Sequence, residues 1–303
     1  DSNNGRMHWS GSTAPIEKSL DTRLARHMAK KISTYAESEH QGKPFFMAVG
    51  FYRPHLPWHA PKRFYDRYKL SDIRLPKGYT ANDLVDIPGA RATAEHREIA
   101  SENQWKKGIR AYLANLSFTD YNVGIVLDAL ENSPYRDNTI VVFSGDHGWH
   151  LGEKERWRKA NLYDQASRTA MIIYDPGRAR SGAVSRKVVG LLDLYPTIAT
   201  IAGVRVPQHL DGRSLDRLLD YPNDPNWDYP AVMRYAGTNI LKTNQWRFVD
   251  KGYRSQLYDI VNDPYEFRNL YNDPAYAKTV RSLRNQLRQL TDFGETGDCS
   301  SAA

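Results

Sequence analysis

A short polar segment, Ser144-Gly145-Asp146-His147-Gly148, holds side chains that could do chemistry together. It directly follows a β-branched run, 139–143, which predicts a buried strand. Open α/β sheets bind their ligands at the carboxyl ends of strands, so Asp146 and His147 are candidate metal ligands. A buried carboxylate needs a partner, and Ca²⁺ or Mg²⁺ prefers oxygen ligands. For the isolated motif, a turn-capping Asp146 and a packed His147 are the alternative.

A charge-rich stretch follows this segment. Residues 151–159 read Leu-Gly-Glu-Lys-Glu-Arg-Trp-Arg-Lys. A solvated surface explains such a run without any function, and this is the usual explanation of clustered charges. A second candidate loop, 53–61, contains three prolines and two histidines. Those prolines exclude a helix and predict a rigid extended loop.

The elements that must position these loops alternate between strands and helices. Apolar residues at helical spacing predict helices over about 21–39, with Asp21 as N-cap, over 103–131, and from Asp193 to Ala202. Apolar runs at 45–51 and 170–174 predict strands buried on both faces. This alternation predicts an α/β fold with a mainly parallel central sheet.

The pattern changes after residue 204. Short strands are predicted at 232–236, 240–243, 246–249 and 256–260, followed by a helix over 275–290. They indicate a small carboxy-terminal subdomain with an antiparallel sheet and a helix. We therefore expect two units, residues 1–204 and residues 205–303.

The composition narrows the possible partners. The 303 residues carry a formal net charge of +7, which favours an anionic partner. No recognised nucleic-acid motif and no apolar run of about 18 residues is present, so we expect neither nucleic acid nor a membrane as partner. The first residues do not resemble a signal peptide or a native start and suggest an internal cut or a product of processing. The single cysteine, Cys299, cannot form an internal disulfide.

The segment from Asp146 to Glu153, followed by Trp157-Arg158-Lys159, closely resembles the second signature region of type I sulfatases, most of all their iduronate-2-sulfatase-like branch. Similar matches occur in family order between residues 45 and 270, including Phe45–His55, Leu192–Thr197, Leu210–Leu215 and Leu257–Glu266. The resemblance implies an alkaline-phosphatase-like α/β sandwich and hydrolysis of sulfate esters of a sugar or polysaccharide.

The resemblance also implies roles for single residues. Asp146 and His147 match the late pair of metal ligands, usually for calcium, with magnesium as the other candidate. Lys159, thirteen positions after Asp146, matches the lysine that contacts the sulfate group. His55 matches the histidine beside the scissile ester and could protonate the leaving alkoxide. Further candidates for a sugar subsite, each with a structural alternative, are Arg53, Trp58, His59, His150, Arg156 and Trp157.

The family's nucleophile is a formylglycine made from the cysteine of a Cys-x-Pro-Ser-Arg motif, and no such motif occurs in this chain. We expect it on a preceding segment, which would be a partner of this chain, and we expect the isolated chain to be inactive. Alternatives are a phosphatase or phosphodiesterase of the same superfamily and a non-catalytic anion-binding module. The resemblance further implies a periplasmic, secreted or lysosomal location.

Overall fold

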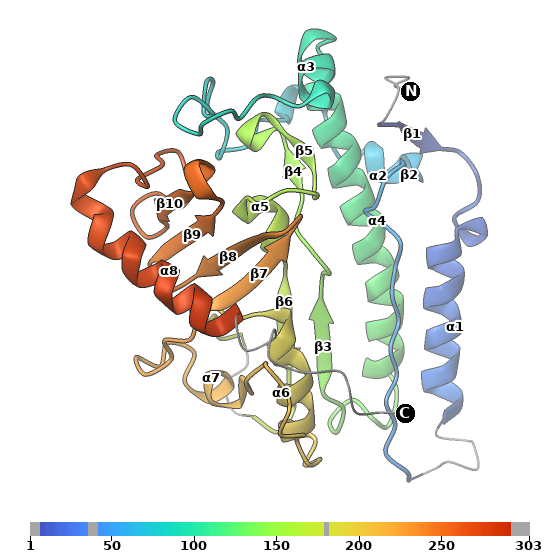
Figure 1. Ribbon diagram of the computed structural model, residues 1–303. Coiled ribbons are helices and arrows are strands. Elements are labelled where there is room, and N and C mark those ends of the chain that lie inside the picture. The colour runs from blue at the N-terminus through green and yellow to red at the C-terminus, as the bar shows by residue number, and fades with distance from the viewer. Residues whose placement is uncertain (1–6, 36–41, 179–181, 292–303) are drawn as a thin grey trace, which may run out of the picture.

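The computed structural model describes residues 7–35, 42–178 and 182–291; Cys299 lies outside them (Figure 1). Its helices are α1 (Leu20–Tyr35), α2 (Lys62–Tyr65), α3 (Ala94–Ser101), α4 (Trp105–Glu131), α5 (Asp164–Ser167), α6 (Leu194–Ile201), α7 (Asp216–Asp220) and α8 (Ala277–Thr291). Its strands are β1 (Trp9–Ser12), β2 (Trp58–Pro61), β3 (Val141–Ser144), β4 (His150–Leu151), β5 (Trp157–Arg158), β6 (Met171–Tyr174), β7 (Ala231–Tyr235), β8 (Thr238–Lys242), β9 (Trp246–Asp250) and β10 (Gln256–Asp259). Among the helices of these ranges, none is both long and apolar enough to cross a bilayer.

The long helix α4 is the centre of the larger core. Its apolar side packs against a cluster that includes Trp58, Phe64 and Trp157, all at most 5% exposed. Helix α1 lies along α4, and a buried hydrogen bond from Thr22 Oγ1 to Asn122 Oδ1, 2.8 Å long, joins the two helices. The predicted helix over 103–131 is therefore confirmed, and it forms the wall on which the candidate loops are built.

The carboxy-terminal part contains the predicted antiparallel sheet. Its strand order is β10-β9-β8-β7, and α8 covers one face (Figure 1). Val280, Leu283 and Leu287 recur on one side of α8 and pack onto Phe248 and Leu257. Both the four short strands and the last helix are thus confirmed.

The segment between residue 204 and this sheet packs on the first part of the chain. Leu215, Leu218 and Trp227 form a cluster against Met171 and Ile173 of β6. A division of the chain at residue 204 stays a proposal.

The predicted mainly parallel sheet is not found among the described residues. Only the short pair β1–β2 is parallel, whereas β3 and β6 pair antiparallel, with Val141 opposite Tyr174. Parallel neighbours need a crossover connection, usually a helix. The connection from β3 to β6 instead contains the hairpin β4–β5 and the four-residue helix α5. The chain can therefore return beside β3 in the opposite direction.

Three local predictions were wrong. The run 170–174 does form a strand, β6, but that strand is not buried on both faces, because Ile172 is 59% exposed. Residues 45–51 pair with no strand in the described part of the chain, and their exposure alternates, with Phe46 82% exposed. Asp21 is not an N-cap, because α1 already begins at Leu20. The Asp21 side chain is buried and binds backbone N–H groups of another segment, a long-range contact that local spacing does not reveal.

Candidate functional site

The segment that contains Asp146 and His147 is packed too tightly for side chains at its glycines. A Cβ on Gly145 would lie 2.2 Å from Thr169 Oγ1, and one on Gly148 would lie 2.1 Å from the Gln165 carbonyl oxygen. A Cβ on Gly152, where φ is 121°, would lie 2.1 Å from the Trp105 ring. These contacts hold the backbone of 145–152 close to α4 and to the residues around α5.

Asp146 and His147 contact each other at the carboxyl end of β3. His147 Nε2 lies 3.3 Å from Asp146 Oδ2, and the side chains are 28% and 85% exposed. His147 Nδ1 lies 2.8 Å from the Gly148 carbonyl oxygen. When Nδ1 carries the proton and donates to this oxygen, the Nε2 lone pair faces the carboxylate, and a cation can bind between the two acceptors.

The two donors therefore fit part of a metal site. A carboxylate oxygen and an imidazole nitrogen, both partly exposed, are suitable ligands for a divalent cation. Within 7–35, 42–178 and 182–291, no group of three or more His, Cys, Asp or Glu side chains could hold a metal. Asp146 and His147 would need further ligands from elsewhere.

The hairpin β4–β5 brings Lys159 back to this segment. Its register pairs His150 with Arg158 and Leu151 with Trp157. Trp149 precedes the first paired residue and Lys159 follows the last one, so both lie next to the open end of this short ladder. The Trp149 ring centroid lies 6.3 Å from that of His147 and 6.4 Å from that of His55. Candidate residues from two segments thus lie beside one indole ring.

The loop of His55 is held by α1. Both carboxylate oxygens of Asp21 accept backbone hydrogen bonds, from Tyr52 N at 3.0 Å and from Arg53 N at 3.1 Å. Arg53 braces the same loop, since its Nε donates to the His59 carbonyl oxygen and its Nη1 to that of His55. His55 itself is exposed, and its Nδ1 lies 2.6 Å from the Leu56 carbonyl oxygen.

Two of the residues expected in a sugar subsite, Trp58 and His150, are completely buried. Trp58 is 0% exposed and donates from Nε1 to the Pro54 carbonyl oxygen, because its large ring fills the core beside α4. His150 is also 0% exposed, with its ring nitrogens against Glu153 O and Asn161 Oδ1. Burial lowers the pKa of His150 to about 4 and outweighs these two contacts, which raise it. Neither side chain lies on the surface expected of a sugar contact.

His59 is half-buried, and its Nδ1 lies 2.6 Å from Ser10 Oγ. Burial, and then the charge of Arg53, lower the pKa of His59. Arg156 is partly buried, with its guanidinium 5.5 Å above the Tyr163 ring. Glu153 accepts from Leu151 N at 2.7 Å, and burial raises its pKa. The charge-rich stretch is therefore largely packed against protein rather than solvated.

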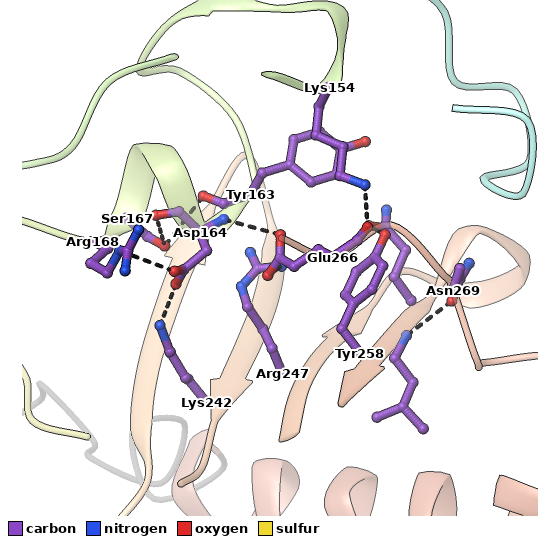
Figure 2. A network of polar contacts seen from close by, with 12 residues as sticks. Lys154, Tyr163, Asp164, Ser167, Arg168, Lys242, Arg247, Tyr258, Glu266 and Asn269 are labelled. Atoms are coloured by element: carbon purple, nitrogen blue, oxygen red, sulfur yellow. Dashed lines mark hydrogen bonds and ion pairs between the residues drawn. The ribbon is translucent and has the colours of Figure 1, made fainter. Parts of the chain in front are cut away.

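Sequence reasoning missed a buried network of charges beside this stretch. Lys154 is 0% exposed, and so is Glu266, on the turn after β10. Figure 2 shows Lys154 directed at the Glu266 backbone, with Arg247 and Asp164 around the Glu266 side chain. The only signal in the sequence was the density of charge itself, which an exposed loop shares.

The chain is similar to known hydrolases over most of its length. A family model described as "Sulfatase" matches residues 2–204, and one described as "N-sulphoglucosamine sulphohydrolase, C-terminal" matches residues 145–292. A "Sulfatase" of Formosa agariphila is 32% identical over 273 residues, which are 87% of this chain and 53% of that protein. The "Iduronate 2-sulfatase" of Mus musculus is 27% identical over 364 residues, covering 90% of this chain and 64% of that protein.

Solved structures show the same fold. One, described as a complex with its substrate D-glucosamine-2-N,6-O-disulfate, superposes with a TM-score of 0.73 at 21% identity, covering 91% of this chain and 70% of that one. The phosphonate monoester hydrolase of Silicibacter pomeroyi gives a TM-score of 0.79 at 23% identity, covering 92% of this chain and 61% of that one. The chain spans between about half and two thirds of the length of the sulfatase of Formosa agariphila and the iduronate 2-sulfatase of Mus musculus.

Proposed function

The chain belongs to the sulfatase family, and from this we propose that it forms the later part of a sulfuric ester hydrolase that acts on a sulfated sugar or polysaccharide. The names of relatives support the substrate class: besides the iduronate 2-sulfatase, an "N-acetylglucosamine-6-O-sulfatase" of Bacteroides thetaiotaomicron is 30% identical over 247 residues. The net charge of +7 suits such an acidic substrate.

The observation that carries the proposal is that His147 and His55, from separate segments, lie beside the Trp149 ring, next to the hairpin that leads to Lys159. Cleavage of a sulfate ester places negative charge on the sulfate oxygens and on the leaving alkoxide. Lys159 would offer an ammonium to the sulfate, where positioned charge stabilises the transition state most. His55, when protonated, can keep one proton on Nδ1 toward the Leu56 carbonyl and deliver the other from Nε2 to the alkoxide.

Asp146 and His147 would hold a divalent metal ion, which we propose to be Ca²⁺, with Mg²⁺ as the other candidate. When bound, the ion would polarise the sulfate oxygens. The 3.3 Å distance between Asp146 Oδ2 and His147 Nε2 supports this role, because both atoms can then bind the same cation.

Arg53 and Arg156 are our candidates for binding acidic groups of the saccharide, since a guanidinium matches carboxylate and sulfate geometry. For Trp58, His59 and His150 we propose a supporting role in the walls of the site, in keeping with their burial.

The remaining parts would come from a segment that precedes this chain in the family. We propose that it supplies the formylglycine and further metal ligands, and that it pairs with exposed extended segments here. Apolar side chains there are open to solvent: Phe46 is 82%, Ile172 59% and Phe143 39% exposed. Phe143 and Ile172 lie opposite each other in the β3–β6 pair, and an exposed apolar face of this kind marks an interaction surface. A mainly parallel sheet, the division near residue 204, and a periplasmic, secreted or lysosomal location belong to the same proposal.

The first prediction tests this function. Co-expressed with the preceding segment and with its cysteine converted, the chain should hydrolyse an aryl sulfate, whereas the chain alone should not, because it lacks the nucleophile. Lys159→Ala in the assembled enzyme should lower kcat/KM by about a hundredfold or more. Lys106→Ala, which removes an exposed lysine of α4, is the matched control.

Assays with an aryl phosphate and a phosphonate monoester decide between this proposal and its main alternative. Faster turnover of either phosphorus ester than of the sulfate would make the enzyme a phosphatase or phosphodiesterase. Turnover of none of the three, with the protein folded, would favour a non-catalytic anion-binding protein.

A further inference from the structure

The tip of the hairpin β4–β5 is inserted into the carboxy-terminal part of the molecule. Lys154, at this tip, is 0% exposed, and its Nζ donates to Asp83 Oδ1 at 3.0 Å and to the backbone oxygen of Glu266. Lys154 and Glu155 both have positive φ, 53° and 49°. Residues other than glycine keep this backbone conformation only where the surroundings impose it. The contacts of Lys154 with Asp83 and Glu266 therefore hold the tip in place.

Glu266 receives the tip and connects it to two further elements. Its side chain, 0% exposed, lies 3.1 Å from Arg247 Nη1 on β9 and accepts from Asp164 N on α5 (Figure 2). Its own φ is 62°. Glu266 thus binds the hairpin through its backbone oxygen. Through its carboxylate it binds both β9 and α5.

Each buried charge of this network has a partner. Lys154, Lys242 and Arg247 face three carboxylates, Asp83, Asp164 and Glu266, and the exposed Arg168 also pairs with Asp164. A buried charge that loses its partner is strongly unfavourable, so each pair constrains the position of the segments that it joins.

The hairpin cannot hold its own shape. Its ladder contains two residue pairs, and an isolated two-stranded hairpin is at best marginally stable in water. Trp149 and Lys159 nevertheless flank its two strands, one residue before β4 and one residue after β5, and Asp146 and His147 lie shortly before it in the chain. The spacing between the candidate metal ligands and the candidate sulfate contact therefore depends on the anchored tip.

We propose that the carboxy-terminal subdomain positions this hairpin through Lys154 and Glu266, and that both are positioning residues for the candidate site at its base. Neither side chain is a catalytic residue in this arrangement. The effect of these residues on catalysis rests on the proposed function. The anchoring of the hairpin does not, because it depends only on contacts within the fold. Small displacements of a charged contact lower rates strongly, because catalysis depends on alignment.

The test uses the enzyme assembled with its preceding segment. Lys154→Met combined with Asp83→Asn removes the ion pair without leaving an isolated buried charge. Amide hydrogen exchange of residues 148–162 should accelerate by about tenfold or more, whereas exchange of α8 should change less than about twofold. On an aryl sulfate, kcat/KM should fall by about tenfold or more. Lys154→Arg, which keeps the cation, should recover most of the protection.

Arg284→Met is the matched control. Arg284 pairs with Asp250 at 3.3 Å and with the Tyr271 hydroxyl at 3.0 Å in the same subdomain, and these partners lie on β9 and on the segment before α8 rather than on the hairpin. It should leave exchange of 148–162 unchanged at a temperature where both variants are folded. Unchanged exchange in the Lys154 double variant, or equal acceleration in the control, would overturn the proposal. Selective acceleration in an enzyme that does not hydrolyse sulfate esters would support the anchoring and overturn the proposed function instead.

Discussion

The indole of Trp149 connects residues that lie far apart in the chain. Besides His55 and His147, its ring contacts those of Trp58, at 5.8 Å, and Tyr112, at 6.3 Å. Its Nε1–H is buried and has no hydrogen-bond acceptor among the described residues. The ring therefore acts through packing, and its removal would let both histidines move.

The third prediction follows from this packing. Trp149→Ala should lower kcat/KM on an aryl sulfate by about tenfold or more, and should destabilise the protein by about 3–5 kcal/mol. Trp149→Phe keeps an aromatic ring and should retain most of the activity. Trp227→Ala, at a buried tryptophan in the cluster of Leu215 and Leu218, controls for stability loss. An equal loss of activity in both alanine variants would argue against a role of Trp149 in the site.

Among the elements, α1 has a role that its amphipathic pattern does not suggest. Asp21, near its start, binds the backbone of Tyr52 and Arg53 and so fixes the entry to the loop of His55. Hydrogen bonds to a charged acceptor contribute about 1.5–3 kcal/mol each. The neighbouring Thr22 instead joins α1 to α4.

The fourth prediction separates these two functions of the helix. Asp21→Asn should accelerate amide exchange at Tyr52 and Arg53, because an amide side chain offers one acceptor oxygen where the carboxylate offers two. Thr22→Val should lower the melting temperature without this local effect. If Asp21→Asn left the two amides as protected as in the wild-type protein, α1 would not hold the loop.

For the whole molecule, stability should depend on pH through buried histidines. His96, on α3, is 6% exposed and lies 4.8 Å, centroid to centroid, from the Trp105 ring. Burial lowers the pKa of His96 from 6.5 to about 4. The unfolded chain therefore binds a proton below pH 6.5 that the folded protein takes up only near pH 4. The contribution of neutral, buried His96 to the free energy of unfolding is complete above pH 6.5. It is lost as the pH falls from 6.5 to about 4.

The fifth prediction is the size of this loss. Between pH 7 and pH 5, His96 should contribute a fall of about 2 kcal/mol in the free energy of unfolding, measured by denaturant titration at both pH values. His96→Gln should remove this part of the pH dependence. The same substitution at the exposed His27 is the control. A pH dependence identical in wild-type and His96→Gln protein would contradict a neutral, buried His96.

The sequence by itself determined the elements whose pattern is local. Helix α4, helix α8 and the four strands of the carboxy-terminal sheet follow from apolar spacing within a few turns or residues. It also determined the family, because the segment from Asp146 to Lys159 has a specific order of residue types. Both the elements and the family can be recognised from residues that are close together in the sequence.

Only the tertiary structure decided which distant residues meet. Lys154 looks like any lysine of a solvated loop, yet its partners Asp83 and Glu266 are 71 and 112 residues away. The direction of β6 beside β3, the burial of Trp58 and the contact of Asp21 with the loop of His55 are equally long-range. A charge in a sequence does not specify whether water or a buried counter-charge solvates it. That choice depends on the packing of the whole chain, because only the folded interior excludes water from both partners.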